Sequence, residues 1–176
     1  MILKDLFGNR ELVNLIEFFI TNSSKESTQT EIINKSKISK VTIIKHIDFL
    51  VQEKLVFLRK IGTSNLYKLN IENVLVKEIK RLNTIIQLQS LSKIDAEEIY
   101  VYGSSARGEN FEESDIDLLI IGKIDRKRAI ESLDQISKKI NKDINFQIFT
   151  RLEWSQMAKK DKPFYERVEK DKIRIK

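Results

Sequence analysis

Cysteine, histidine and proline are scarce in this 176-residue sequence, which has no cysteine, one histidine and one proline. Without cysteine there can be no disulfide framework, no thiolate zinc site and no cysteine nucleophile, and a single histidine excludes every motif that needs two. No apolar run approaches the ~18 residues of a membrane span, and residues 1–5 do not have the character of a secretory signal. We therefore expect a cytoplasmic protein with no membrane partner.

The rest of the composition is that of a folded chain. Hydrophobic residues make up 41% of it, and nine Phe, four Tyr and one Trp provide apolar surface for a core. The length suits one ordinary domain or two small ones. The net charge of +6 is shared equally by residues 1–75 and 76–176, so basicity alone is weak evidence for nucleic-acid binding.

Three helices are predicted in the first part of the chain. Residues 11–20 repeat apolar side chains at helical spacing. Thr28 and Glu31 have the spacing of a capping box, which predicts a short second helix. Ser39 is suited to cap a longer third helix. The apolar face of that helix would be formed by Ile43, Ile44, Ile47, Leu50 and Val51.

A hairpin should follow, because the β-prone runs 55–60 and 67–69 are separated by the turn-forming residues 62–65. The order of two helices, a turn, a third helix and a hairpin resembles a winged helix-turn-helix over residues 8–70. The resemblance is one of pattern, since that family has no invariant chemistry. It implies a DNA-binding domain, and the alternative is a helical module that makes only protein contacts.

In a winged helix the third helix enters the major groove and the hairpin approaches phosphates. Double-stranded DNA is therefore the expected partner. The predicted contacts are Lys40, Thr42, Lys45 and His46 on the outer side of the helix, and Arg59, Lys60 and Lys68 on the hairpin. Taken alone, His46 is expected to be a solvated surface residue rather than a reader of bases.

A connecting helix is predicted for residues 73–93, where apolar side chains recur at spacings of four, three and four. These side chains are Leu75, Ile79, Leu82 and Ile86. They could pack within the chain or against a second copy of it, so a homodimer is one expected assembly.

The most specific motif lies between residues 98 and 121. A β-prone segment leads into a Gly-Ser pair, an Arg-Gly pair follows, and Ser-Asp-x-Asp opens an apolar strand. These residues are Gly103, Ser104, Arg107, Gly108, Ser114, Asp115 and Asp117. Their order and spacing resemble the signature of the minimal nucleotidyltransferases of the polymerase-beta superfamily.

Asp115 and Asp117 are two positions apart on a strand, so their carboxylates project from one face and can share magnesium ions. Metals held in this way can bridge the phosphates of a nucleoside triphosphate. The alternative is a solvated acidic turn with Glu112 and Glu113, which leaves the Gly-Ser pair unexplained.

The other motif residues suit a nucleotide. Gly103 would let the backbone approach the triphosphate, and the amides with the Ser104 hydroxyl would bind its oxygens. Arg107 would complement the polyphosphate charge. Gly108 is expected to permit a turn.

The superfamily normally has a third acidic residue on a later strand, and here that position falls on Asn145 in the alternating run 143–150. An asparagine can ligate a cation but cannot accept a proton, so transfer should suffer more than nucleotide binding. Asp143 lies on the same face one pleat earlier, about 7 Å away, and is the candidate replacement base.

Three helices are predicted around that strand. One begins at Asp125, a second contains Trp154 as a core residue, and a third begins near Pro163. The tail 170–176 alternates in polarity and is expected to be an edge strand or a frayed end.

The predicted fold class is therefore α+β. A winged helix-turn-helix (residues 1–72) and a connecting helix (73–93) precede a nucleotidyltransferase-like α/β domain with a small mixed sheet (94–176). The combination resembles helix-turn-helix regulators fused to a minimal nucleotidyltransferase.

The expected function is magnesium-dependent transfer of a nucleoside monophosphate from a nucleoside triphosphate, coupled to DNA binding. The alternative is a transcriptional regulator whose nucleotidyltransferase-like domain is a nucleotide sensor or is catalytically inactive. A toxin–antitoxin partner protein is left open.

Overall fold

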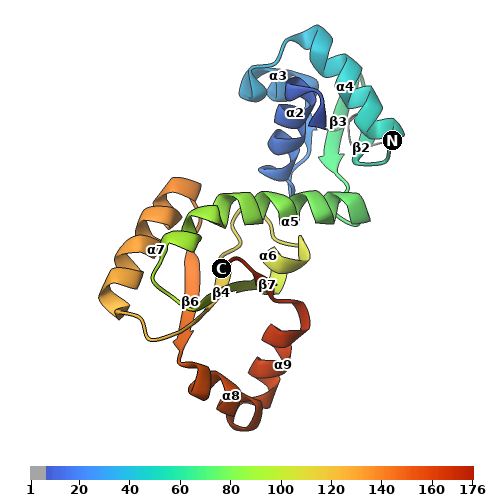
Figure 1. Ribbon diagram of the computed structural model, residues 1–176. Helices are drawn as coiled ribbons and strands as arrows, with labels where there is room; N and C mark the ends of the chain where they lie inside the picture. Colours follow the sequence, from blue (N-terminus) through green and yellow to red (C-terminus); the bar gives the residue numbers. More distant parts are fainter. Residues whose placement is uncertain (1–6) are drawn as a thin grey trace. The chain divides into compact units, whose positions relative to one another are not determined.

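The computed structural model describes residues 7–176, which form two compact units with the division between Val76 and Lys77. In the first unit, helices pack beside a small antiparallel sheet of order β1-β3-β2 (Figure 1). The helices are α2 (Arg10–Ile20), α3 (Gln29–Ser36) and α4 (Lys40–Gln52). The strands are β1 (Ser27–Thr28), β2 (Val56–Ile61) and β3 (Ser64–Leu69).

Local capping explains where two of these helices begin. Thr28 and Glu31 form the predicted capping box, each accepting a hydrogen bond from the other's backbone N–H. The Ser39 hydroxyl accepts a hydrogen bond from the Thr42 N–H at the start of α4. Behind these caps lies an apolar core. Its fully buried members are Leu15, Phe19, Ile32, Ile43 and Ile47.

The sheet differs from the prediction in two places. The polar run before α3 includes strand β1, whose Ser27 pairs with Tyr67 of β3. The hairpin turn is also shorter than predicted, because Ile61 pairs with Ser64 and only two residues remain in the loop. Gly62 has a φ of +57° at the first loop position, the conformation that two-residue hairpins require there.

The second unit is built on a mixed sheet of order β6-β5-β4-β7. β4 is antiparallel to β5 and β7, while β5 and β6 are parallel. The strands are β4 (Glu98–Tyr102), β5 (Ile116–Ile121), β6 (Ile144–Phe149) and β7 (Ile173–Arg174). The predicted α+β class with a small mixed sheet is thus confirmed, and the tail forms an edge strand.

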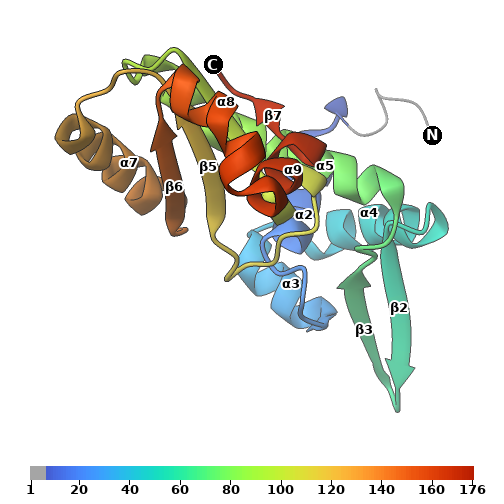
Figure 2. The same cartoon turned by 90° about the horizontal axis from the view of Figure 1, so that it is seen from below.

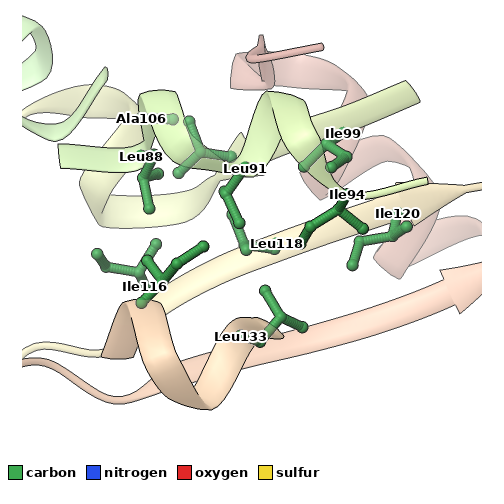
Figure 3. Close-up of a cluster of buried hydrophobic side chains, with 11 residues drawn as sticks. Leu88, Leu91, Ile94, Ile99, Ala106, Ile116, Leu118, Ile120 and Leu133 are labelled. Atoms are coloured by element: carbon green, nitrogen blue, oxygen red, sulfur yellow. The ribbon is translucent and has the colours of Figure 1, made fainter. Parts of the chain in front are cut away.

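Helices cover both faces of this sheet because β5 is apolar on both of its sides. Leu118 and Ile120 belong to a cluster with α5, η1 and α7 (Figure 3). Leu119 and Ile121 belong to a second cluster, with α8 and α9. Figure 2 shows the ribbons of β5, α8 and α9. The helices are α5 (Val74–Leu88), α6 (Gly103–Arg107), α7 (Arg126–Ile140), α8 (Arg151–Lys160) and α9 (Lys162–Asp171), and η1 is a 3₁₀ helix (Gln89–Lys93).

The three helices predicted around β6 are present. The Asp125 carboxylate caps α7, Trp154 is 7% exposed on α8, and Pro163 lies in the first turn of α9. Among residues 7–176, no helix is both long enough and apolar enough to span a membrane.

Packing within the chain, one of the two arrangements left open for the apolar side chains of α5, does not apply to two of them. Leu82 and Ile86 are 42% and 61% exposed. The buried side chains follow each other at intervals of four, and they are Val76, Lys80, Thr84 and Leu88. Because Lys80 and Thr84 are polar, apolar periodicity in the sequence does not indicate this buried face.

Candidate active site

The chain turns sharply between β4 and α6, at Gly103. Gly103 has a φ of +71°, and a Cβ added there would lie 2.9 Å from the Asp117 Oδ2 atom. The sheet register explains this approach, because Tyr102 pairs with Asp117 on the neighbouring strand. Glycine adopts this left-handed backbone conformation without strain, and the Gly-Ser pair begins directly beside the second aspartate.

Asp115 and Asp117 are joined by Asn145 from the adjacent strand. The parallel register of β5 and β6 pairs Asp117 with Asn145. The Asn145 amide nitrogen donates a hydrogen bond of 2.9 Å to the Asp115 Oδ2 atom, and its side chain also hydrogen-bonds to Asp117. The structure therefore brings these three predicted site residues together with Gly103.

This arrangement raises the pKa of Asp117. Burial is the main cause, and the negative charge of Asp115 adds to it. The Arg167 guanidinium on α9 and the Asn145 hydrogen bond oppose the rise. Arg167 was not identified from the sequence, because only the packing of α9 against the sheet brings it near β5.

The donor set can be compared with the needs of a magnesium ion. Basic side chains interact electrostatically with both carboxylates, Lys142 with Asp115 and Arg167 with Asp117. Residues 7–176 contain no cluster of three or more acidic or histidine side chains suited to a metal. Two carboxylates and one amide oxygen fit a magnesium ion that keeps several waters.

Arg107 lies between two carboxylates that the sequence did not reveal. Its Nε donates to Glu109 at 2.7 Å, and its Nη1 donates to Asp171 at the end of α9. Asp171 also accepts a hydrogen bond of 3.4 Å from the Gly103 N–H. Asp171 is 64 residues from Arg107, so no local spacing signals the contact.

Asp143 is placed beside this group rather than within it. Its backbone carbonyl accepts a hydrogen bond from Ile116, and its side chain is exposed. It lines a pocket of about 450 Å³. The other lining residues are Glu112, Glu113, Ser114, Ser137, Lys138, Asn141 and Lys142. A role for Asp143 as a base therefore stays a prediction.

Two lysines fix the loop that leads into Asp115. The ammonium of Lys142 donates to the Phe111 carbonyl at 2.8 Å, and that of Lys80 donates to the Asn110 carbonyl. Lys80 is 2% exposed, and burial lowers its pKa to about 8. Neither lysine was identified from the sequence, because each hydrogen-bonds to a carbonyl about 30 residues away in the chain.

The residues predicted to contact DNA are arranged differently from expectation on α4. Lys40 and Lys45 are exposed, and Thr42 is half-buried with its hydroxyl hydrogen-bonded to Ser39. The predictions that His46 faces outward and is solvated are wrong, because His46 is only 8% exposed. Its position next to Ile47 on the inward side of the helix accounts for this burial.

The basic residues of the hairpin also differ in their surroundings. Arg59 is exposed and forms a two-point ion pair with Glu26, whereas Lys60 is exposed and Lys68 half-buried. Large apolar side chains on β2 are exposed beside them. These are Phe57, Leu58 and Ile61.

Comparison with known proteins identifies the second unit. The family described as "Nucleotidyltransferase domain" matches residues 79–175, which is more than half of the chain. The chain therefore belongs to the nucleotidyltransferase domain family. A crystal structure of a proposed nucleotidyltransferase from Sulfolobus solfataricus matches with 18% sequence identity and a TM-score of 0.32, covering 56% of this chain and 85% of that one. No curated protein matches the chain.

Proposed function

We propose that the second unit is a magnesium-dependent nucleotidyltransferase, which moves a nucleoside monophosphate from a nucleoside triphosphate to an acceptor hydroxyl. The observation that supports it best is the contact between the Gly103 turn and the Asp117 carboxylate. That contact puts a backbone suited to phosphates next to side chains suited to a cation.

Each residue has a part in this proposal. Asp115 and Asp117 would hold magnesium, with the Asn145 carbonyl turned toward it in place of the amide NH₂. Bound magnesium would neutralise phosphate charge and stabilise the leaving pyrophosphate. The amides and hydroxyl at Gly103 and Ser104 would bind phosphate oxygens. The acceptor oxygen attacks the α-phosphorus as the bond to pyrophosphate breaks.

The acceptor hydroxyl must lose its proton during this transfer. Asp143 is the proposed recipient, because its exposed carboxyl lines the pocket beside Asp115. An acceptor bound in that pocket would bring its hydroxyl to the side of the site where Asn145 cannot take a proton.

Incorporation of label from an α-labelled nucleoside triphosphate tests the transfer. Asp117→Asn should abolish it, because one cation ligand loses its charge. Asp134→Asn is the matched control: it removes the same charge from an exposed position on α7 and should retain activity. Persistence of incorporation in Asp117→Asn would remove the site assignment.

A nucleotide sensor is the second candidate, and the observation that favours it is Asn145 at the third acidic position. A sensor would bind nucleotide with magnesium but release no pyrophosphate. Thermal unfolding measures the binding, since ligand at 100 times its dissociation constant stabilises a protein by ~2.7 kcal/mol. Stabilisation that is lost in Asp115→Asn, without any transfer, would select the sensor.

We further propose that the first unit is a DNA-binding winged helix. The order of its helices and hairpin supports this, as does the exposure of Lys40 and Lys45 on α4. Replacing both lysines by alanine should weaken binding and flatten its salt dependence by roughly one unit of slope per lost phosphate contact. Lys127→Ala on α7 is the control. Unchanged binding in the double variant would contradict the proposed role of α4.

Two partners are retained as proposals. A homodimer is supported by the exposed Leu82 and Ile86 on α5, and the mass of the protein in solution tests it. No residue identifies a toxin–antitoxin partner.

A further inference from the structure

Asp171 ends helix α9, and its side chain is 12% exposed. The next strand, β7, holds the segment in place, since Ile173 pairs with Val101 of β4 and the Ile175 N–H donates to the Ile99 carbonyl. β4 is also the strand that leads into Gly103. The carboxylate of Asp171 is therefore fixed at the Gly103 turn by strand pairing rather than by a free tail.

The two contacts of this carboxylate are the same donors that were assigned to phosphate. One oxygen accepts from the Gly103 N–H at 3.4 Å, and the other accepts from Arg107 Nη1. A carboxylate and a phosphate both present anionic, acceptor-only oxygens. A triphosphate that binds through the Gly103 N–H and Arg107 Nη1 therefore competes with Asp171 for them.

The ion pairs of Arg107 point the same way. Arg107 already has two carboxylate partners, Glu109 and Asp171, and both raise its pKa. Glu109 is also close to two lysines, Lys77 at 3.8 Å and Lys170, whose charges lower its pKa. A polyphosphate that approaches Arg107 therefore meets a guanidinium that is already paired with carboxylates.

We propose that Asp171 is an internal competitor of the triphosphate. Its carboxylate occupies the Gly103 N–H and Arg107 until the α9–β7 segment moves away from them. The inference rests on the proposed function, because it assumes that Gly103 and Arg107 are the phosphate donors. The opposing interpretation is that Asp171 orients Arg107 for phosphate. The two interpretations predict opposite effects when the carboxylate is removed.

Binding of inorganic tripolyphosphate without magnesium, measured by calorimetry, separates them. Asp171→Asn, and Asp171→Ser as a second variant, should bind at least tenfold more tightly than the unchanged protein, because a charge-assisted hydrogen bond no longer competes. Glu166→Gln is the matched control: it removes one exposed charge from the same helix and should change affinity less than twofold. Circular dichroism confirms that each variant is folded.

Arg107→Gln supplies the internal check. In that background Asp171→Asn should bring little further gain, because the masked cation is gone. Equal or weaker binding in both Asp171 variants would overturn the proposal and favour the orienting role. Absence of tripolyphosphate binding in every form would overturn it too.

Failure of the proposed function looks different. If tripolyphosphate binds more tightly to Asp171→Asn while no form incorporates label from an α-labelled nucleotide, the competition stands and the transferase is rejected. If the unchanged protein transfers nucleotide but the Asp171 variants bind no more tightly, only the competition is rejected.

Discussion

Gly108 offers the sharpest test of the packing around the site. It ends α6 with a φ of +68°, and a Cβ added there would lie 2.1 Å from the Lys77 carbonyl oxygen and 2.8 Å from its carbon. Gly103 has nearly the same φ, +71°, but its nearest atom is a side-chain oxygen at 2.9 Å. Alanine thus has the same backbone strain at both positions, but it contacts a movable side chain at Gly103 and fixed backbone atoms at Gly108.

The magnitudes follow from this difference. A left-handed conformation costs a non-glycine residue about 1–2 kcal/mol, which applies to both substitutions. At Gly103 the carboxylate of Asp117 can rotate away, so we expect Gly103→Ala to lose about that amount. At Gly108 the backbone of α5 must shift by more than an ångström, and overpacking of this kind adds about 1–3 kcal/mol. Gly108→Ala should therefore lose about 2–5 kcal/mol.

Urea unfolding followed by tryptophan fluorescence measures both losses. Trp154 is the single tryptophan of the chain and is 7% exposed in the second unit, so the signal reports that unit alone. Failure of Gly108→Ala to fold would agree with the upper end of the range. Equal losses in the two variants would refute the close approach of Gly108 to α5.

Two further predictions concern stability. In the folded protein the pKa of Lys80 is lowered from 10.5 to about 8. Above pH 8 the unfolded chain therefore binds more protons than the folded one, and the free energy of unfolding should rise by about 2 kcal/mol toward pH 9.5. Lys80→Met should flatten this rise, and a pH profile that Lys80→Met leaves unchanged would contradict the burial of the ammonium. Thr28→Ala removes half of the capping box and should lower the stability of the first unit by about 1 kcal/mol by circular dichroism, whereas no change would mean that the cap does not stabilise α3.

Features encoded over a few residues could be predicted from the sequence. The caps at Thr28, Ser39 and Asp125 depend on spacings of two or three residues, and each is present. The alternation of 143–150 predicted β6, and the Asp-x-Asp spacing placed both carboxylates beside Asn145. These features can be predicted because the interacting residues are neighbours in the chain or lie across one strand pair.

Features that depend on distant segments could not be predicted. His46 is buried by the packing of α4, which its own sequence does not specify. Lys80 occupies a buried stripe because the Asn110 carbonyl of a later loop accepts a hydrogen bond from its ammonium. Asp171 reaches Arg107 only after β7 joins the sheet. In each case the missing information was the identity of the contacting segment.

Asn145 and Asp171 have a common electrostatic effect on the site. Asn145 stands where the family has a third carboxylate, and Asp171 occupies donors assigned to phosphate. A third carboxylate beside Asp115 and Asp117 would add like charge to a pair in which the pKa of Asp117 is already raised. The Asn145 amide instead donates to Asp115, which lowers the electrostatic cost of the cation-free state. Asp171 does the same for Arg107 at the other end of the site. Both residues therefore stabilise the site as the structure shows it, and in the proposed function magnesium and triphosphate would displace both of these contacts.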